Sequence, residues 1–327
     1  MKQSEVLIIG GGPAGAACAW KLRQYGVNVL ILDKQAFPRN KTCAGWITPQ
    51  VLRDLEFEPE EYPHGLSTFS TLHLSIRGMP LIIPGKQYAI RRYEFDGWLL
   101  QRSNAPLIQH HVREISEVEG GYVVDNEYFG RHLVGAGGTY CPVYHTLFKA
   151  ESRRDPGGRI VGMEEEFQWQ WKNGQCRLWF MENNLPGYAW YVPKKDGWVN
   201  IGVGGFVGKM KARGDTIQNH WLELVTKMET RGLITRHTYK PVSHLYNVHQ
   251  NVPEVQRNRV YLVGDAAGLA TLDMGEGIGP AVSSGLLAAQ AILSDQKYTV
   301  ETIPRYSLLP RIFQRREQTN KPNLYQL

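Results

Sequence analysis

The chain has 327 residues, of which 42% are hydrophobic and 21% are charged. This composition is typical of a globular protein with one large or two modest hydrophobic cores, and it excludes a disordered or low-complexity chain. The formal charge of +6 comes mostly from dispersed lysines and arginines. Because no nucleic-acid-binding motif accompanies that charge, we expect no nucleic-acid partner.

Several sequence features bear on the compartment of the protein. No apolar run approaches the roughly 18 residues that a membrane-spanning helix requires. The charged, strand-like start MKQSEVLIIG is unlike a signal peptide. The four cysteines have irregular spacing and form no CxxC motif, which predicts reduced thiols rather than a disulfide framework or a metal site. We therefore expect a cytoplasmic protein without a bound metal.

Residues 301–327 predict a short C-terminal tail, whose basic part reads RIFQRREQTNKPNLYQL. A basic tail is most often a solvated surface. If this tail has a partner, an anionic membrane lipid or an acidic redox protein would fit its charge. Peripheral membrane association through the tail is therefore one expectation.

The first fifty residues predict a βαβ unit. SEVLIIG is an apolar run of strand length, GGGPAGAACAWKLRQYG has helical spacing, and VNVLILD reads as a second buried strand. The first turn has the GxGxxG pattern, whose glycines permit a tight turn, close approach of a pyrophosphate, and close packing of helix on strand. An aspartate ends the second strand, where it can accept hydrogen bonds from an adenosine ribose. The unit therefore predicts a dinucleotide site, for NAD or FAD, made of Gly10, Gly12, Pro13, Ala14, Gly15 and Asp33.

Two later segments favour FAD. In RVYLVGDAAGLATLDMGEGIGP a buried strand ends at Asp265, where a carboxylate could hold the ribityl chain of a flavin, although a turn aspartate is the alternative. A helix expected from about Gly279 to Leu293 would direct its positive end at the flavin pyrimidine. HLVGAGGTYCP again lets backbone approach a ligand closely. These segments add Ala136, Gly138, Gly264, Asp265, Gly275, Gly277 and Ile278 to the predicted FAD site.

From residue 1 to about 295 the chain resembles the flavoprotein family that includes aromatic hydroxylases, flavin-dependent halogenases and geranylgeranyl reductases. The resemblance implies an α/β fold in which a Rossmann-like FAD-binding domain is interleaved with an antiparallel β-sheet substrate domain. IRRYEFDGWLLQ is similar to the family segment R-x-x-F-D-x-x-L, whose arginine, here Arg92, usually contacts FAD; an exposed arginine on an amphipathic helix is the alternative. The implied FAD-binding domain comprises 1–67, 92–158 and 251–300, and the substrate domain comprises 68–91 and 159–250.

The substrate half shows period-two alternation of aromatic residues. EEFQWQWK, QCRLWFM and GYAWYVP predict antiparallel strands with an aromatic face, which includes Trp169 and Phe180. Such a face can be an ordinary core, or it can form an apolar slot for a long hydrocarbon or an aromatic ring. DTIQNHWLELVTKMETRG predicts a helix on the outer side of this sheet.

The string YAWYVPKKDGWVNIGVGG resembles a motif of geranylgeranyl reductases, Y/W-x-W-x-F/I-P followed by seven or eight residues and G-x-G. Here a valine stands where phenylalanine is usual. In that family the motif lines the substrate cavity against the flavin. Aromatic side chains would supply a flat apolar wall, and the glycines would leave space for a bulky substrate. The resemblance thus implies substrate contacts for Tyr188, Trp190, Pro193, Gly202 and Gly204.

KTCAGW resembles the loop of the same reductases in which a cysteine and two small residues approach the flavin ring. The resemblance places Lys41, Ala44 and Gly45 at the cofactor. Cys43 would face the reacting alkene or the flavin as a proton donor, a positioning group or a small apolar wall, and simple burial is the alternative. Together with Tyr188 and Trp190, Cys43 is a candidate catalytic residue.

The leading functional hypothesis is an FAD-dependent reductase that hydrogenates carbon–carbon double bonds of an isoprenoid chain. NADPH or a ferredoxin-like redox partner would supply the electrons. An aromatic monooxygenase or halogenase is the first alternative, because YAWYVP partly resembles the halogenase motif W-x-W-x-I-P. Halogenases rely on a tunnel lysine, for which Lys34 and Lys41 are the nearest candidates, although we expect both at the surface. A non-catalytic protein that binds flavin and lipid is the second alternative.

Overall fold

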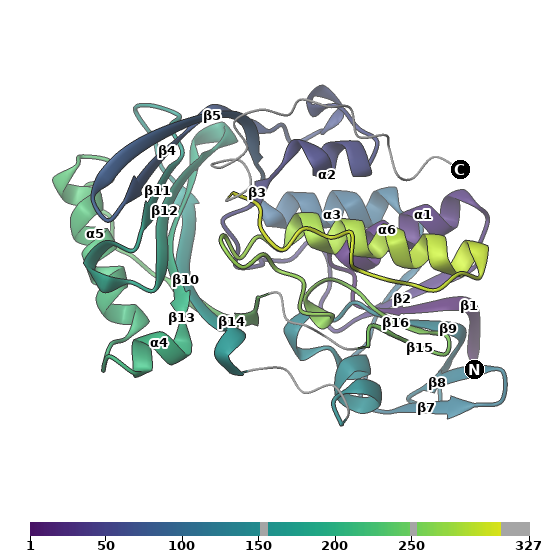
Figure 1. The fold of residues 1–327 in the computed structure, drawn as a ribbon. Helices are drawn as coiled ribbons and strands as arrows, with labels where there is room; N and C mark the ends of the chain where they lie inside the picture. Colours follow the sequence, from purple (N-terminus) through teal and green to yellow (C-terminus); the bar gives the residue numbers. More distant parts are fainter. Residues whose placement is uncertain (151–155, 249–253, 309–327) are drawn as a thin grey trace.

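The computed structural model describes residues 1–150, 156–248 and 254–308. Two eight-stranded sheets form the framework (Figure 1). The basic segment RIFQRREQTNKPNLYQL lies outside the described residues, so the predicted role of the tail stays a prediction. No helix within the described ranges is long and apolar enough to cross a membrane.

The first sheet has the strand order β15–β16–β9–β1–β2–β6, and β6, β2, β1, β9 and β16 run parallel. A hairpin of β7 and β8 pairs antiparallel with the first half of β9. The predicted βαβ unit is confirmed at its centre. The strands are β1 Lys2–Ile9, β2 Val29–Asp33, β6 Leu107–Gln109, β7 Ile115–Val118, β8 Gly121–Val124, β9 Tyr128–Gly135, β15 Gln256–Arg257 and β16 Val260–Leu262.

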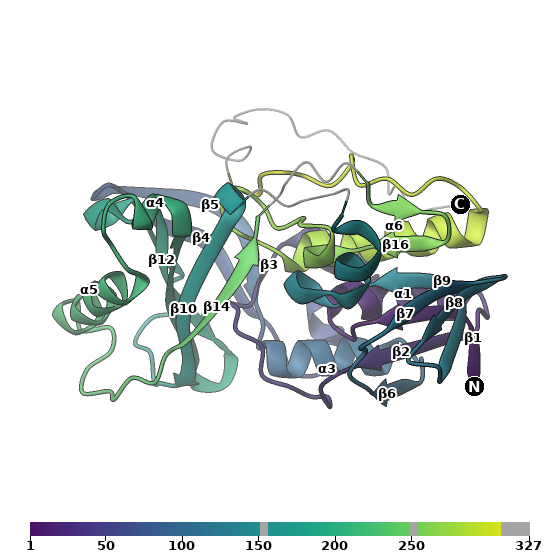
Figure 2. The same ribbon diagram turned by 90° about the horizontal axis from the view of Figure 1, so that it is seen from below.

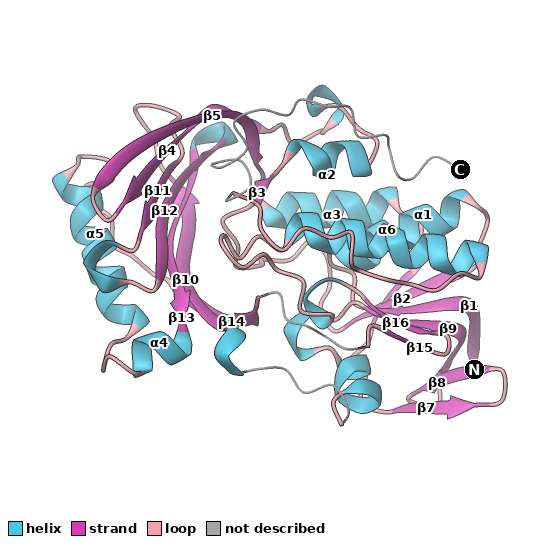
Figure 3. Ribbon diagram, viewed as in Figure 1, coloured by secondary structure: helices cyan, strands magenta, loops and turns pink. Residues whose placement is uncertain are grey.

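Helices α1, α3 and α6 cover one face of this sheet (Figure 3), and α1 packs between the other two (Figure 2). A Cβ on Gly285 of α6 would lie 2.2 Å from the carbonyl oxygen of Ala14 in α1, so the two helices meet backbone to backbone. The helices are α1 Pro13–Gln24, α2 Pro49–Asp54, α3 Arg92–Arg102 and α6 Ile278–Ser294. The short 3₁₀ turns are η1 Pro59–Glu61, η2 Gly138–Tyr140, η4 Pro156–Gly158, η5 Glu182–Asn184, η6 Lys195–Gly197 and η7 Gly264–Ala266, and a π-helical turn spans Tyr144–Phe148.

The second sheet has the order β14–β10–β13–β12–β11–β4–β5–β3. Its described strand pairs are antiparallel except for β4 and β11, which run parallel. These two strands come from separate stretches of chain, so no hairpin forces them to be antiparallel. The strands are β3 Trp46–Ile47, β4 Ser67–Ile76, β5 Met79–Ala89, β10 Arg159–Gln168, β11 Arg177–Phe180, β12 Gly187–Lys194, β13 Trp198–Phe206 and β14 Val242–Asn247.

The two faces of the second sheet have different partners. Helices α4 (Val207–Lys211) and α5 (Ile217–Thr230) pack on its outer face, as predicted for the α5 segment. Residues such as Tyr191 and Ile201 point to that face and form a core with Trp221. The opposite face, with Trp190 and Leu178, looks toward the first sheet. Figure 2 shows the two sheets as separate layers at the left and right of the view.

Candidate functional site

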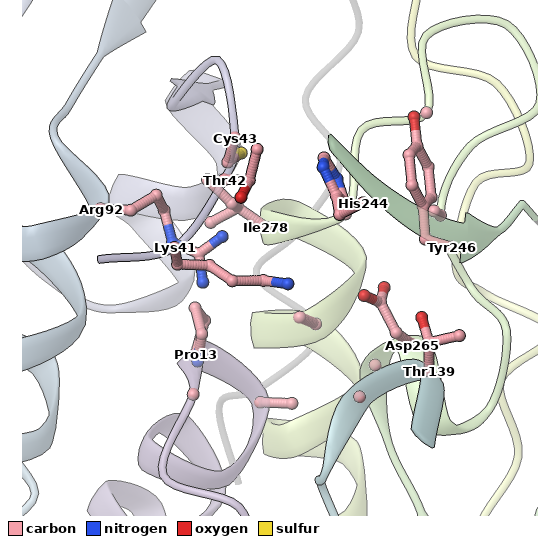
Figure 4. Close-up of a pocket in the computed structure, with 18 of the residues that line it drawn as sticks. Pro13, Lys41, Thr42, Cys43, Arg92, Thr139, His244, Tyr246, Asp265 and Ile278 are labelled. Carbon is pink, nitrogen blue, oxygen red and sulfur yellow. The ribbon is translucent and has the colours of Figure 1, made fainter. Parts of the chain in front are cut away.

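A cavity of about 920 Å³ lies between the two sheets. Its walls come from the carboxyl ends of β1, β2 and β9, the start of α6, and the inner faces of β10, β12 and β14. Ligands of open parallel sheets bind at this edge, because the loops that follow the strands gather there. Figure 4 shows side chains from these distant segments around one space.

The glycines of the first turn have separate roles. Gly10 has a φ of +116°, and a Cβ there would lie 2.3 Å from the carbonyl oxygen of Ala136. A Cβ on Gly15 would lie 1.9 Å from the carbonyl oxygen of Gly10. A Cβ on Gly12 would meet only the Arg39 guanidinium, at 3.5 Å. Gly10 and Gly15 therefore permit close packing, whereas Gly12 leaves backbone open to the cavity.

The first turn of α1 is free to receive an anion. Its N-cap is Gly12, no side chain caps it, and its first turn contains no acidic residue. Exposed amide groups and the positive end of a helix dipole attract phosphate groups. Pro13 and Ala14 of this turn also line the cavity.

Asp33 lies on the cavity wall at the end of β2 and also holds the glycine turn in place. One carboxylate oxygen accepts a hydrogen bond from the Gly11 amide at 2.8 Å, and the other accepts one from the Gln35 amide at 2.9 Å. The predicted contact with a ribose stays a prediction. The carboxylate nevertheless has a structural role that the sequence did not suggest.

Arg92 is buried, so the alternative of an exposed helical arginine is wrong. Its side chain donates two hydrogen bonds to Asp96, at 2.6 and 2.7 Å, and only 8% of the residue is exposed. Arg39 lies 3.6 Å from the same carboxylate. Arg92 also lines the cavity, so a buried ion pair fixes a positive group in the wall.

The segment after β16 lies far from the glycine turn in the sequence and forms another wall of the same cavity. Asp265 lies in the turn η7, and a Cβ on Gly277 would lie 3.4 Å from its carboxylate. The amide of Gly264 donates a hydrogen bond to the Ser284 hydroxyl, which ties the turn to α6. Helix α6 begins at Ile278 without a side-chain cap. The structure thus brings the three predicted FAD segments to one cavity, with Ala136, Gly138, Gly264, Asp265, Gly275, Gly277 and Ile278 all in its lining.

The loop that contains Cys43 crosses from the first sheet to the second. Cys43 lines the cavity and is partly buried. Its amide donates a hydrogen bond to the Glu164 carboxylate, and its thiol accepts one from the Gly45 amide at 3.4 Å. Gly45 has a φ of +71°, and a Cβ there would lie 2.0 Å from the carbonyl oxygen of Ile90. Gly45 therefore serves close packing of the loop on the chain before α3, and it is Cys43 and Ala44 that face the cavity.

Tyr188 and Trp190 of β12 form an aromatic part of the cavity wall, with their ring planes inclined at 49°. The Tyr188 hydroxyl donates to the carbonyl oxygen of Met274 at 2.6 Å. The Trp190 indole N–H donates to the side-chain oxygen of Asn200 at 2.7 Å. Because protein groups satisfy both polar atoms, the rings present apolar surface.

Several predicted substrate contacts lie elsewhere. Gly202 and Gly204 do not line the cavity. A Cβ on Gly202 would approach within 2.2 Å of the Trp190 ring, so Gly202 makes room for the indole. Trp169 follows the end of β10, packs with the outer core and donates to the carbonyl oxygen of Leu233 at 2.8 Å. Phe180 stacks on Tyr188 outside the lining, with ring centroids 5.0 Å apart. Pro193 alternates with Val192 along β12 and is directed away from the cavity.

The structure adds cavity residues that the sequence reasoning missed. Glu164 on β10 is only 4% exposed, and burial raises its pKa to about 7 against the opposing effect of Lys194. His244 on β14 stacks on Tyr246, and burial together with the charges of Lys41 and Arg92 lowers its pKa to about 4. The sequence signal for both residues was strand alternation, which turns Glu164 in EEEF and His244 in VSHLYN to one face of their strands.

Lys41 extends into the cavity toward Asp265 (Figure 4). Burial and the charge of Arg92 lower its pKa, whereas Asp265 opposes this shift. Lys41 is an exposed residue, as expected, and its amine is directed into the cavity. Lys34 also borders the cavity.

Comparisons with known proteins indicate an FAD-dependent oxidoreductase. The FAD dependent oxidoreductase family matches residues 5–98. An uncharacterized protein of Methanosarcina barkeri is 32% identical over 314 residues, covering 91% of this chain and 76% of that protein. Digeranylgeranylglycerophospholipid reductase 2 of Methanopyrus kandleri is 26% identical over 308 residues, covering 88% and 76% of the two chains. The chain belongs to the FAD-dependent oxidoreductases, and its relatives include proteins named digeranylgeranylglycerophospholipid reductase.

Solved structures of this flavoprotein fold are also similar. A geranylgeranyl bacteriochlorophyll reductase-like protein from Thermoplasma acidophilum has a TM-score of 0.77 at 20% identity, covering 90% of this chain and 80% of that one. A flavin-dependent brominase has a TM-score of 0.72 at 16% identity, covering 90% and 79%. At these identities the likeness shows the fold alone, which is shared by reductases and halogenases in this flavoprotein group.

The geometry of the cavity fits the cofactor of the family. Gly12 leaves space at the uncapped start of α1, as a pyrophosphate requires. The start of α6 is likewise uncapped, and it faces the same space beside Asp265. The protein is therefore an FAD-dependent oxidoreductase, and the non-catalytic alternative is set aside.

Proposed function

We propose that this oxidoreductase hydrogenates carbon–carbon double bonds of an isoprenoid chain of the geranylgeranyl type. One observation carries the proposal: the Cys43 loop and the Tyr188–Trp190 wall bound the same cavity as the glycine turn that would hold FAD. Relatives named digeranylgeranylglycerophospholipid reductase support the choice of substrate class. When bound and reduced, the flavin supplies a hydride to one alkene carbon.

The residues around the cavity have distinct proposed roles toward FAD. The start of α1 and Gly12 would bind the pyrophosphate, and Asp33 would bind the adenosine ribose. Asp265 would hold the ribityl chain, and the start of α6 would face the pyrimidine edge, where a helix dipole stabilises negative charge. Lys41 and Arg92 would add positive charge near the cofactor.

An isolated double bond has no carbonyl group to polarise, so the protein must work mainly by positioning and by excluding water. The aromatic wall suits this task. The hydroxyl of Tyr188 and the indole N–H of Trp190 are both hydrogen-bonded to protein groups. Leu178 and Val192 continue the apolar lining. Cys43 would lie at the reacting end of this slot as a small wall or positioning group.

The electron donor would be NADPH or a ferredoxin-like protein. The sequence has a single GxGxxG turn, and the proposal assigns this turn to FAD, so the donor would approach from outside. Contact of the basic tail with a membrane or a redox partner is a further part of the proposal. Salt dependence of lipid-vesicle binding would test the tail.

The decisive experiment is anaerobic turnover. Purified holoprotein reduced with dithionite would be mixed with a geranylgeranyl-bearing glycerophospholipid, and products would be analysed by mass spectrometry. We expect a mass gain of one H₂ for each reduced bond, together with reoxidation of the flavin absorbance. Absence of any hydrogenated product with this lipid and with geranylgeranyl diphosphate would refute the proposal.

A halogenase or aromatic monooxygenase is the second candidate, and Lys41 favours it. Its amine reaches into the cavity from the same loop as Cys43 (Figure 4), in keeping with the lysine on which halogenases rely. This candidate requires oxygen, whereas the reductase does not. Product formation only in air, with halide or oxygen incorporated into an aromatic substrate, would select it over the reductase.

A further inference from the structure

We propose that Glu164 is the proton donor of the cavity, supplying the proton that completes saturation of the double bond. This inference rests on the proposed reductase function. Hydride addition to one alkene carbon leaves the other carbon in need of a proton. An acid that is buried, held in one position and open to the cavity can supply it.

The position of Glu164 follows from strand alternation. On β10, Glu164 and Glu166 are directed to the cavity side, while Glu165 between them is directed outward and contacts His237 at 3.1 Å. Glu164 lies opposite Gly202 of β13, and Gly202 in turn lies opposite Trp190 of β12. Strand β13 therefore separates the Glu164 carboxyl group from the Trp190 indole, and Gly202 places no side chain between them.

Hydrogen bonds connect Glu164 to both parts of the proposed substrate site. One carboxyl oxygen accepts the amide hydrogen of Cys43. The Asn200 amide nitrogen donates to the same oxygen at 3.4 Å, and the Asn200 oxygen receives the indole N–H of Trp190. Since these contacts occupy one oxygen, the other oxygen can carry the proton. Glu164 lines the cavity itself, so the proton has a direct route to a bound alkene.

The surroundings of Glu164 favour its protonated form near neutral pH. Burial raises its pKa to about 7, the Lys194 ammonium opposes this shift, and Glu166 adds to it. Lys194 is 1% exposed and forms its ion pair with Glu166, so its charge is largely compensated. Tyr246 from β14 is another titratable group that interacts with Glu164, whereas Cys43 from the loop contacts it through the backbone amide.

The groups around Glu164 also stabilise the carboxylate that remains after the proton has been transferred. When the O–H bond of Glu164 breaks and the new C–H bond forms, the Cys43 amide and the Lys194 ammonium stabilise the carboxylate. Glu166 and Arg91 are both partly exposed and lie 2.9 Å apart, so they extend this network from Lys194 toward solvent. Glu164 can regain its proton from water along that side, and the external electron donor restores the reduced cofactor.

Glu164→Gln is the central test, because it keeps the size and the acceptor oxygen but removes the acid. Anaerobic turnover should fall at least about 100-fold, within the range expected for a general acid. FAD content and dithionite reduction should stay unchanged, which separates a proton-transfer defect from misfolding. Glu165→Gln, the outward neighbour, is the matched control and should turn over like the wild type. Glu164→Asp retains an acid and should recover part of the rate.

Two pH measurements sharpen the test. Wild-type turnover should decline above about pH 7, where the acid is lost, while the residual rate of Glu164→Gln should not follow that profile. Infrared difference spectra of the holoprotein should show a protonated-carboxyl band that disappears through the same pH range and is missing from Glu164→Gln. Turnover of Glu164→Gln within twofold of wild type, or an unchanged carboxyl band, would overturn the inference. Failure of the wild type to hydrogenate any isoprenoid would instead refute the proposed function, and the donor role with it.

Discussion

The indole of Trp190 lies directly against Gly202 of the neighbouring strand. The two residues are partners in the β12–β13 register, and a Cβ on Gly202 would approach within 2.2 Å of the Trp190 ring and within 2.8 Å of the Glu164 Cβ. Real Cβ atoms do not tolerate such distances, so any side chain at Gly202 must displace the indole or the strand. The orientation of the Trp190 ring thus depends on the absence of a side chain at Gly202.

Gly202→Ala should therefore lower the free energy of unfolding by about 1–3 kcal/mol, the usual cost of overpacking. It should also reduce turnover, because the tilted indole intrudes on the cavity. Gly204→Ala is the matched control, since its Cβ would lie 3.5 Å from the same indole, an ordinary contact. Urea unfolding and tryptophan fluorescence of both variants would check this prediction. Equal behaviour of the two variants would contradict the role assigned to Gly202.

Cys43→Ala should keep bound FAD but slow product formation. The Cys43 amide still donates to Glu164 in this variant, so the loop should keep its position, whereas the thiol surface in the cavity is lost. Flavin absorbance of the purified protein and anaerobic turnover would be compared with those of the wild type. Unchanged turnover would remove the Cys43 thiol from the reaction and leave it a wall residue.

Asp265→Asn should weaken FAD binding by about tenfold or more, the effect of losing a charged hydrogen-bond acceptor. The substitution preserves the shape of the η7 turn while removing the charge that would hold the ribityl chain. Asp295→Asn provides a control, because Asp295 is exposed at the opposite end of α6. Equilibrium dialysis or fluorescence titration with FAD would measure both. Full affinity in Asp265→Asn would argue against the ribityl assignment.

The stability of the fold should depend on pH through Glu164. Burial raises the pKa of Glu164 from 4.5 to about 7 in the folded protein, so the folded state binds this proton more tightly than the unfolded chain. Its contribution to stability is complete below pH 4.5 and is lost as the pH rises through about 7. The free energy of unfolding of the wild type, measured relative to Glu164→Gln, should therefore fall across this window. A constant difference between the two proteins would show that Glu164 has an ordinary pKa.

Features governed by local backbone geometry could be predicted from the sequence. The glycine turn before α1, the aspartate after β16 and the glycine-rich end of β9 all carry short patterns whose physical reason is local. Residues whose role depends on packing between distant segments could not be predicted in this way. Phe167 and Trp169 share one face as the alternation predicts, but this face is the outer one, where they pack with Trp221 of α5. The Gly202–Trp190 contact depends on strand register, which the sequence does not state.

The missed acid shows the same limit. A glutamate in EEEF is unremarkable by composition, because three successive carboxylates usually indicate a solvated surface. Alternation along a strand directs Glu164 and Glu165 to opposite faces, but it is the pairing of β10 with β13 and β14 that shows which face is covered. Likewise, Arg92 could be an exposed helical arginine until Asp96 is found beside it at full burial.

The backbone contact between Ala14 and Gly285 has a consequence for biosynthesis. The ribosome delivers α6 long after α1, so a growing chain cannot complete the cradle until α6 has been translated. Cofactor loading must therefore be a late event, and ribosome-bound chains stalled before α6 should remain colourless.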